Sequence, residues 1–341
     1  MRRSIDMAAH CIIGSVRDVG SACEGSILGL AIGDALGFPA EFRRRNQIVA
    51  AFGGEIRDFV ALHDPRWPPR PVIMGKTHPP GTYSDDTQMT IALAEGLLDT
   101  RDDDDLDVRM NAIGRRFVAW SSSPDNDRAP GNACMTGCHA FARGAPWRTS
   151  GVADSKGCGS AMRVAPIGLM YAADRSKLLE LARGQSLLTH RHDAGIEGAA
   201  AAALLVGLAV QRRSPREMFD EVMAECAPRS PDFAACLAKV PALLDAAPEL
   251  ALSAGGLGEA WVAEEAVASA LWCFWRSPDD FARVVTTAAT TDGDSDSIAC
   301  IAGSIAGAYL GVDAIPERWR ASVENAAGLT DLARRIAARA V

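Results

Sequence analysis

The chain lacks the cysteine pattern of a disulfide-stabilised protein. Its nine cysteines are an odd number and follow no framework spacing across the 341 residues. Such a scatter is typical of a reducing compartment, so we expect no disulfide scaffold. Cys134, Cys138 and His139 stand close together, but no second cysteine pair follows at the spacing of a zinc site. A structural zinc is therefore not expected.

Long apolar runs free of charge are also missing. The N-terminus has two arginines but no apolar stretch of secretory type, because Asp6 and His10 interrupt it. The net charge of −8 argues against broad affinity for nucleic acid or an anionic membrane. We therefore expect a soluble, cytoplasmic protein. Three apolar segments are shorter than a membrane span or contain a charge, and we expect buried helices there: Ser26–Phe38, Ala199–Val210 and Ile298–Val312.

Alternation of apolar and polar residues, the pattern of a half-buried strand, is scarce, and Arg57–Leu62 is the best example. Helical spacing dominates instead. Ile298, Ile301, Ile305 and Tyr309 recur at steps of three and four, and "EGAAAAALLVGLAV" is rich in strong helix formers. No stretch has the character of a linker between independent units. The sequence predicts one mostly or wholly α-helical domain.

Glycines recur at every fourth position in two of the predicted helices. Each costs about 1 kcal/mol of helix propensity relative to alanine. A regular stripe favours two helices whose backbones lie in close contact, and compositional drift in a sequence rich in small residues is the alternative. The glycines are Gly25, Gly29, Gly33 and Gly37 in one segment and Gly303, Gly307 and Gly311 in the other.

Two junctions between a loop and a helix combine carboxylates with hydroxyls: "SDDT" from Ser84 and "DGDSDS" from Asp292. The second resembles the start of a calcium loop, but Ser297 and Gly303 stand where an EF-hand has glycine and glutamate. Each junction alone is ordinarily explained by helix capping. If the two converge, at least four acids share one site. Each like-charge pair at ~4 Å then repels by roughly 4 kcal/mol, so the cluster requires protons or hard cations such as Mg²⁺, Mn²⁺ or Ca²⁺.

Five segments, in order along the chain, resemble the ADP-ribosylglycohydrolases related to the dinitrogenase reductase-activating glycohydrolase. They are "GSILGLAIGDALGFPAEF", "GTYSDDTQM", "SKGCGSAMRVAPIGL", "LTHRHDAG" and "GDSDSIACIAGSIAGAYLG". The likeness covers nearly the whole chain after about Cys23. It implies an all-α orthogonal helical bundle, with residues 23–341 as the family domain and residues 1–22 as an N-terminal extension.

The resemblance also implies a cleft with two Mg²⁺ or Mn²⁺ ions. Glu41 matches an acidic position that touches metal or the reacting water in some members, and it is our candidate general base. Asp292 stands where relatives commonly have glycine, and we favour a simple loop residue over an outer-shell acid. With Glu41, the residues expected in catalysis are Asp85, Asp86 and Asp296. The metal ligands implied are Ser84, Asp85, Asp86, Asp294, Asp296 and Ser297.

The segment beginning at Ser155 matches the substrate loop of the family, and its glycines let backbone N–H groups approach a phosphate. Lys156 either adds charge there or is an ordinary exposed lysine. His190 matches a ligand-contacting histidine, whereas His192 is expected to be a cap or surface residue. Arg163 is expected to hold the loop through buried hydrogen bonds. The substrate-binding residues implied are Ser155, Lys156, Gly157, Cys158, Gly159, Ser160 and His190.

We predict a hydrolase that cleaves the bond at C1″ of the distal ribose and releases ADP-ribose. The ions would orient the ribose diol and lower the pKa of a bound water. ADP-ribosyl-arginine is the first choice of substrate because the D-S-D-S and S-K-G-C-G segments look like the arginine-directed branch. ADP-ribosyl-serine and O-acetyl-ADP-ribose stay open. Two other classes are a binding or immunity protein that captures an ADP-ribosyltransferase or its target, and a Mg²⁺-dependent phosphoesterase that would yield AMP.

The segment before the likeness, "MRRSIDMAAHCIIGSVRDVGSA", is not needed for this chemistry. A frayed leader or an extra helical turn is the ordinary explanation. Ile12, Ile13 and Val16 fall at helical spacing. A short amphipathic arm that docks on a cognate ADP-ribosyltransferase is therefore the alternative.

Overall fold

The computed structural model describes residues 16–67 and 78–340 of the chain. These residues form sixteen α-helices and no β-strand, which confirms the predicted all-α class. Arg57–Leu62, the best example of strand-like alternation in the sequence, is irregular in the structure. The helices are α1 (Val16–Gly37), α2 (Arg45–Phe52), α3 (Asp85–Leu98), α4 (Leu106–Ser121), α5 (Asn132–Ala142), α6 (Ala165–Met170), α7 (Arg175–Leu187), α8 (Asp193–Val210), α9 (Pro215–Glu225), α10 (Pro231–Leu237), α11 (Pro248–Ala251), α12 (Ala263–Arg276), α13 (Phe281–Ala288), α14 (Ser295–Leu310), α15 (Glu317–Ser322) and α16 (Ala326–Ala337).

Helix α1 begins at Val16, inside the segment 1–22 that the sequence assigned to an extension. Residues 1–15 lie outside the described part, and so does most of the proposed amphipathic arm. Its docking on a transferase stays a prediction.

Two helical segments, Val19–Gly37 and Asp193–Val210, are long and apolar enough to cross a membrane by length and composition. In this fold 78% of the first window and 83% of the second are buried inside the protein. Their side chains form part of the core, as the sequence predicted for Ser26–Phe38 and Ala199–Val210.

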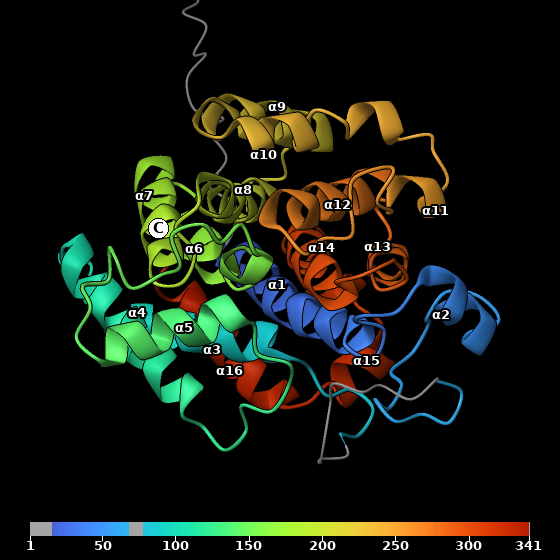
Figure 1. Cartoon of the computed structure of the whole chain (residues 1–341), viewed down its shortest axis with the longest axis horizontal. Coiled ribbons are helices and arrows are strands. Elements are labelled where there is room, and N and C mark those ends of the chain that lie inside the picture. The colour runs from blue at the N-terminus through green and yellow to red at the C-terminus, as the bar shows by residue number, and fades with distance from the viewer. Residues whose placement is uncertain (1–15, 68–77, 341) are drawn as a thin grey trace, which may run out of the picture.

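Helices α1 and α14 lie side by side in the middle of the molecule (Figure 1). Their glycines face one another: a Cβ added to Gly29 would lie well under 3.0 Å from the carbonyl oxygen of Gly303, and one added to Gly307 would meet that of Gly25. The Ser26 hydroxyl also donates to the carbonyl oxygen of Ser304 at 3.0 Å. The glycine stripes therefore mark a backbone-to-backbone crossing, as predicted.

The remaining helices cover this central pair. Helices α8, α12 and α13 pack against α14, whereas α16 packs against α1, and α3 contacts both α1 and α14 (Figure 1). Because α14 follows directly on the second acidic junction and α3 on the first, this arrangement brings the two junctions to the same end of the α1–α14 pair.

Candidate active site

Asp34, on α1, holds the first acidic junction in place. Its carboxylate accepts hydrogen bonds from the backbone N–H groups of Ser84 (2.8 Å) and Thr87 (3.0 Å) and from the Thr87 hydroxyl (2.5 Å). The Ser84 hydroxyl in turn accepts from the N–H of Asp86 at 3.2 Å. These donors belong to the first turn of α3, which has no partners for them within the helix. Asp34 was missed at the sequence level, where a single acid in an apolar helix gave no sign of its partner.

The second junction is held by its own cap and by the loop around Asp292. Asp294 caps α14 by accepting from the N–H of Ser297 at 3.3 Å. The Asp292 carboxylate accepts from the N–H of Arg45 at 2.7 Å, at the start of α2. Asp292 therefore supports a neighbouring helix and does not line the acidic cavity, in agreement with the loop role that we favoured.

The two junctions converge. The Ser297 hydroxyl donates to the Asp86 carboxylate at 3.1 Å, which joins α14 to α3. Glu41, Asp294 and Asp296 each offer a carboxylate oxygen, and these oxygens lie within 4.8 Å of one another. All three side chains are buried. Hard cations prefer such an oxygen-only set, so these residues fit a divalent metal.

The pKa values of the clustered carboxyl groups also favour a bound cation. Burial, followed by the negative charge of Asp296, raises the pKa of Asp85, Asp86 and Asp294 well above the usual carboxyl range. The same two causes raise the pKa of Asp34 to about 7. Carboxylates held this close in a low dielectric repel one another, so the ionised cluster requires positive charge.

A cavity of about 720 Å³ opens over the acids. The predicted site residues that line it are Glu41, Asp85, Asp86, Asp294, Asp296, Ser297, Ser155, Gly157, Cys158, Gly159 and His190. Three others lie off it. Ser84 is fully buried at the start of α3, and the Ser160 hydroxyl donates to the carbonyl oxygen of Gly195 at 3.1 Å. Lys156 turns away from the cavity and forms ion pairs with Glu264 (2.6 Å) and Asp232 (3.0 Å).

The glycine-rich loop rests on His190. A Cβ added to Gly159 would lie 2.9 Å from Cε1 of His190, and one added to Gly157 would lie 3.0 Å from Nε2. Burial, followed by the charge of Arg163, lowers the pKa of His190 to about 3, so its ring is neutral at physiological pH. The Cys158 thiol donates to the Asp294 carboxylate at 2.9 Å. Cys158 thus connects the loop to the acidic cluster.

Arg163 supports the loop through a network of buried hydrogen bonds, as predicted, in which Gln185 Nε2 donates to the carbonyl oxygen of Ser160 at 2.9 Å. Arg163 is fully buried and donates to Gln185 Oε1 (2.8 Å), to the Gln185 carbonyl oxygen (3.1 Å) and to the Thr189 hydroxyl (2.8 Å). His192, also as predicted, is a cap, because its Nδ1 accepts from the N–H of Ala194 at 3.1 Å at the start of α8.

Backbone bonds between distant segments join the loops around the cavity. Arg43 forms an isolated antiparallel bridge with Gly293, and Gly157 forms another with Val262. The N–H of Asp294 donates to the carbonyl oxygen of Glu259 at 2.9 Å. These contacts link the segment after Glu41 to the second junction, and the second junction to the glycine-rich loop through residues 259–262.

Several cavity residues were not anticipated from the sequence. They come from four places: Phe42 beside Glu41, the loop and helix start at residues 127–134, Met162 after the glycine-rich loop, and Trp261 before α12. The N–H of Gly131 donates to the Asp85 carboxylate at 3.3 Å. Of these residues, only Phe42 could have been found from the sequence, because it directly follows Glu41.

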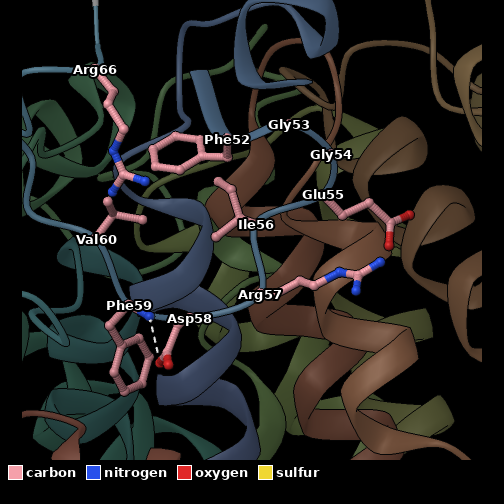
Figure 2. A pocket seen from close by; sticks show the side chains of 10 residues that line it. All are labelled: Phe52, Gly53, Gly54, Glu55, Ile56, Arg57, Asp58, Phe59, Val60 and Arg66. Carbon is pink, nitrogen blue, oxygen red and sulfur yellow. Dashed lines mark hydrogen bonds between the residues drawn. The ribbon is translucent and has the colours of Figure 1, made fainter. Parts of the chain in front are cut away.

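A second cavity, of about 400 Å³, lies between α2 and the loop that follows it (Figure 2). The Arg66 guanidinium lies 4.1 Å from the centre of the Phe52 ring, and the N–H of Phe59 donates to Asp58 at 2.9 Å. None of the predicted site residues lines it, and the acidic cluster found among the described residues is in the other cavity. We therefore place the chemistry over the acids.

The chain belongs to the ADP-ribosylglycohydrolase family, whose sequence profile matches residues 16–341. It is 32% identical to the human ADP-ribosylhydrolase ARH3 over 281 residues, which cover 71% of this chain and 75% of that one. It is 26% identical to the ADP-ribosylarginine hydrolase Tri1 of Pseudomonas putida, over 93% of this chain and 78% of that one. A solved structure described as an ADP-ribosylglycohydrolase-related protein complex superposes with a TM-score of 0.74 at 25% identity, over 95% of this chain and all of that one. The predicted class, an ADP-ribosylhydrolase, is confirmed.

Proposed function

We propose that the protein hydrolyses ADP-ribosyl-arginine at C1″ of the distal ribose, with two Mg²⁺ or Mn²⁺ ions as cofactors. The observation that carries the proposal is the convergence of both acidic junctions with Glu41 in one cavity, beside a glycine-rich loop. The likeness to Tri1, named an ADP-ribosylarginine hydrolase, supports the arginine acceptor. The likeness to ARH3 keeps other acceptors in the test.

The residues that would hold the cations are the six expected from the sequence, and Glu41 stands beside them as the proposed general base. Serine and carboxylate oxygens suit Mg²⁺ and Mn²⁺, and two divalent ions would balance four aspartates. Bound there, the cations would offset the repulsion among the carboxylates and polarise oxygens of the substrate and of water. The proposed metal ligands are Asp85, Asp86, Asp294, Asp296 and Ser297, which line the cavity, and Ser84, which is buried next to them at the start of α3.

The chemical step follows from the bond that breaks. A water oxygen bonds to C1″ while the C1″–N bond to the guanidine breaks, and the electron pair of that bond stays on nitrogen. Glu41 takes one proton from the water and a proton passes from it, directly or through solvent, to the released guanidine nitrogen, so the products are ADP-ribose and unmodified arginine and Glu41 is regenerated. The carboxylates around C1″ stabilise the positive charge that develops on the ribose in the transition state.

The rest of the substrate lies along the glycine-rich loop. Gly157 and Gly159 line the cavity, where their backbone would meet a pyrophosphate, and the neutral ring of His190 packs closely against both glycines. Lys156 is held by Glu264 and Asp232, away from the cavity. Pyrophosphate binding in this chain therefore depends on backbone N–H groups and not on the lysine.

The test is incubation with peptides ADP-ribosylated on arginine or on serine, with mass spectrometry of the products and Glu41→Gln as the inactive control. Free ADP-ribose and unmodified arginine peptide support the proposal. AMP and ribose phosphate would point to the phosphoesterase alternative. Binding without turnover, in wild type and Glu41→Gln alike, would point to a capture protein, which membership of a hydrolase family with its acids present does not favour.

A further inference from the structure

Two aromatic side chains form an exposed stack at the edge of the acidic cavity. The rings of Phe42 and Trp261 lie 5.0 Å apart between centroids with an interplanar angle of 21°. Phe42 is 50% exposed and Trp261 is 38% exposed, and both line the cavity. We call this pair the rim stack. Two large aromatic side chains this exposed beside a site are candidates for contact with a substrate.

The backbone is built to hold the rim stack outward. Phe42 has φ +61° and Ala260, directly before Trp261, has φ +66°, a region that non-glycine residues rarely adopt. The N–H of Phe42 donates to the carbonyl oxygen of Gly293 at 3.0 Å. The bridge between Gly157 and Val262 fixes the residue after Trp261. Unusual backbone conformation maintained by such bonds, at Phe42 and at the residue before Trp261, points to function.

The charge around the rim stack is negative. The indole N–H of Trp261 donates to the Glu259 carboxylate at 3.3 Å. That carboxylate also binds the guanidinium of Arg44, which lies 3.8 Å from the Asp292 carboxylate as well. Because the single guanidinium of Arg44 is shared by the two carboxylates, net negative charge remains beside the aromatic rings, which suits a planar cation better than a pyrophosphate.

The place of the rim stack relative to a bound substrate follows from its neighbour Glu41. Phe42 directly follows Glu41, whose carboxylate belongs to the acidic cluster where C1″ would lie. The group attached to C1″ is the acceptor, so a surface that borders the cluster outside the glycine-rich loop faces the acceptor. We propose that the rim stack binds the guanidinium of the ADP-ribosylated arginine and selects arginine over uncharged acceptors. This inference rests on the proposed function.

The experiment compares Trp261→Ala, Phe42→Ala and Trp261→Phe with wild type. Val108→Ala is the matched control, because Val108 is 44% exposed and lies on α4, outside the cavity. Three quantities are measured: KM and kcat for an arginine-modified peptide, the same constants for a serine-modified peptide, and inhibition by free ADP-ribose. A thermal melt of each variant checks that it is folded.

We expect Trp261→Ala and Phe42→Ala to raise KM for the arginine peptide about tenfold with little change in kcat, as loss of a partly exposed cation–π contact predicts. Trp261→Phe retains a ring and keeps most of the affinity. The serine peptide and the inhibition constant of ADP-ribose should not change.

Equal weakening of ADP-ribose inhibition and of both peptides would overturn the inference, because the rings would then stack on adenine. Unchanged KM for the arginine peptide would also overturn it while leaving the proposed function intact. Failure of the wild-type protein to cleave the arginine linkage would instead refute the proposed function, and the inference with it.

Discussion

Replacing Gly33 by alanine should damage the active site from a distance. Gly33 lies on α1 where a Cβ would come well under 3.0 Å from the carbonyl oxygen and carbonyl carbon of Ala299, on α14. Both obstacles are backbone atoms, so no side chain can rotate aside. Ordinary contact begins near 3.4 Å, and the two helices must therefore separate by on the order of 1 Å.

The magnitude follows from where α14 begins. Ala299 is three residues after Asp296, so the displacement reaches the acidic cluster with little attenuation. A misplacement of about 1 Å at a reacting centre costs roughly 100-fold in rate. Overpacking lowers the free energy of unfolding by about 1–3 kcal/mol, and the higher helix propensity of alanine offsets about 1 kcal/mol of this loss. We therefore expect Gly33→Ala to lose about 100-fold in kcat/KM but only a few degrees in Tm.

The control is Gly20→Ala on the same helix, where an added Cβ has nothing within 4 Å. It should leave activity unchanged and stabilise the fold by about 0.5–1 kcal/mol. The assays are ADP-ribose release and thermal unfolding by circular dichroism. If Gly33→Ala matched Gly20→Ala in both, the close crossing of α1 and α14 would be refuted.

Three further predictions concern the acids. Removal of divalent metal by EDTA should abolish turnover, and Mg²⁺ or Mn²⁺ should restore it; full activity in a demonstrably metal-free preparation would exclude the proposed cofactors. Asp85→Asn and Asp296→Asn should each remove most activity, and the double mutant should be far less than multiplicatively worse, because residues that act as a unit are non-additive; independent losses would mean that the two junctions serve separate functions. In chelated protein the folded-state pKa of Asp34 is about 7, against 3.8 for an ordinary aspartate, so the folded state binds more protons and the free energy of unfolding falls as pH rises through this window. Tm without metal should accordingly be lower at about pH 7.5 than at about pH 5.5, with Mg²⁺ restoring more at the higher pH, and a flat profile would contradict this reasoning.

The features that could be predicted from the sequence are those with a local signature. The acidic junctions were visible because a cap and a helix start stand next to each other in the chain, and α3 and α14 do begin at Asp85 and Ser295. The glycine stripes were visible because a helical face repeats every three to four residues. Both signals depend on spacing within one segment.

Features that depend on a distant partner could not be predicted. Asp34 is understood only once the first turn of α3 lies against it, 50 residues later in the chain. The alternation at Arg57–Leu62 reflects real burial of Val60 and Leu62, but residues 16–67 and 78–340 contain no strand with which the segment could pair. Lys156 sits in a loop that matches a substrate loop, yet Glu264 from α12 determines where its charge lies. Motif resemblance fixes backbone position more reliably than side-chain direction.

An active site of this kind must hold its reaction centre in place and must also recognise an acceptor. The backbone bonds that join the loops of the cavity make the first task independent of the second. Bonds such as those between Arg43 and Gly293, or between Gly157 and Val262, do not depend on which side chains these residues carry. The parts proposed to face the ribose and the phosphates can therefore keep their relative positions while the outward side chains at positions 42 and 261 change. A single scaffold of this kind can acquire a new acceptor by substitution at its edge, without rebuilding the centre where the bond is cut.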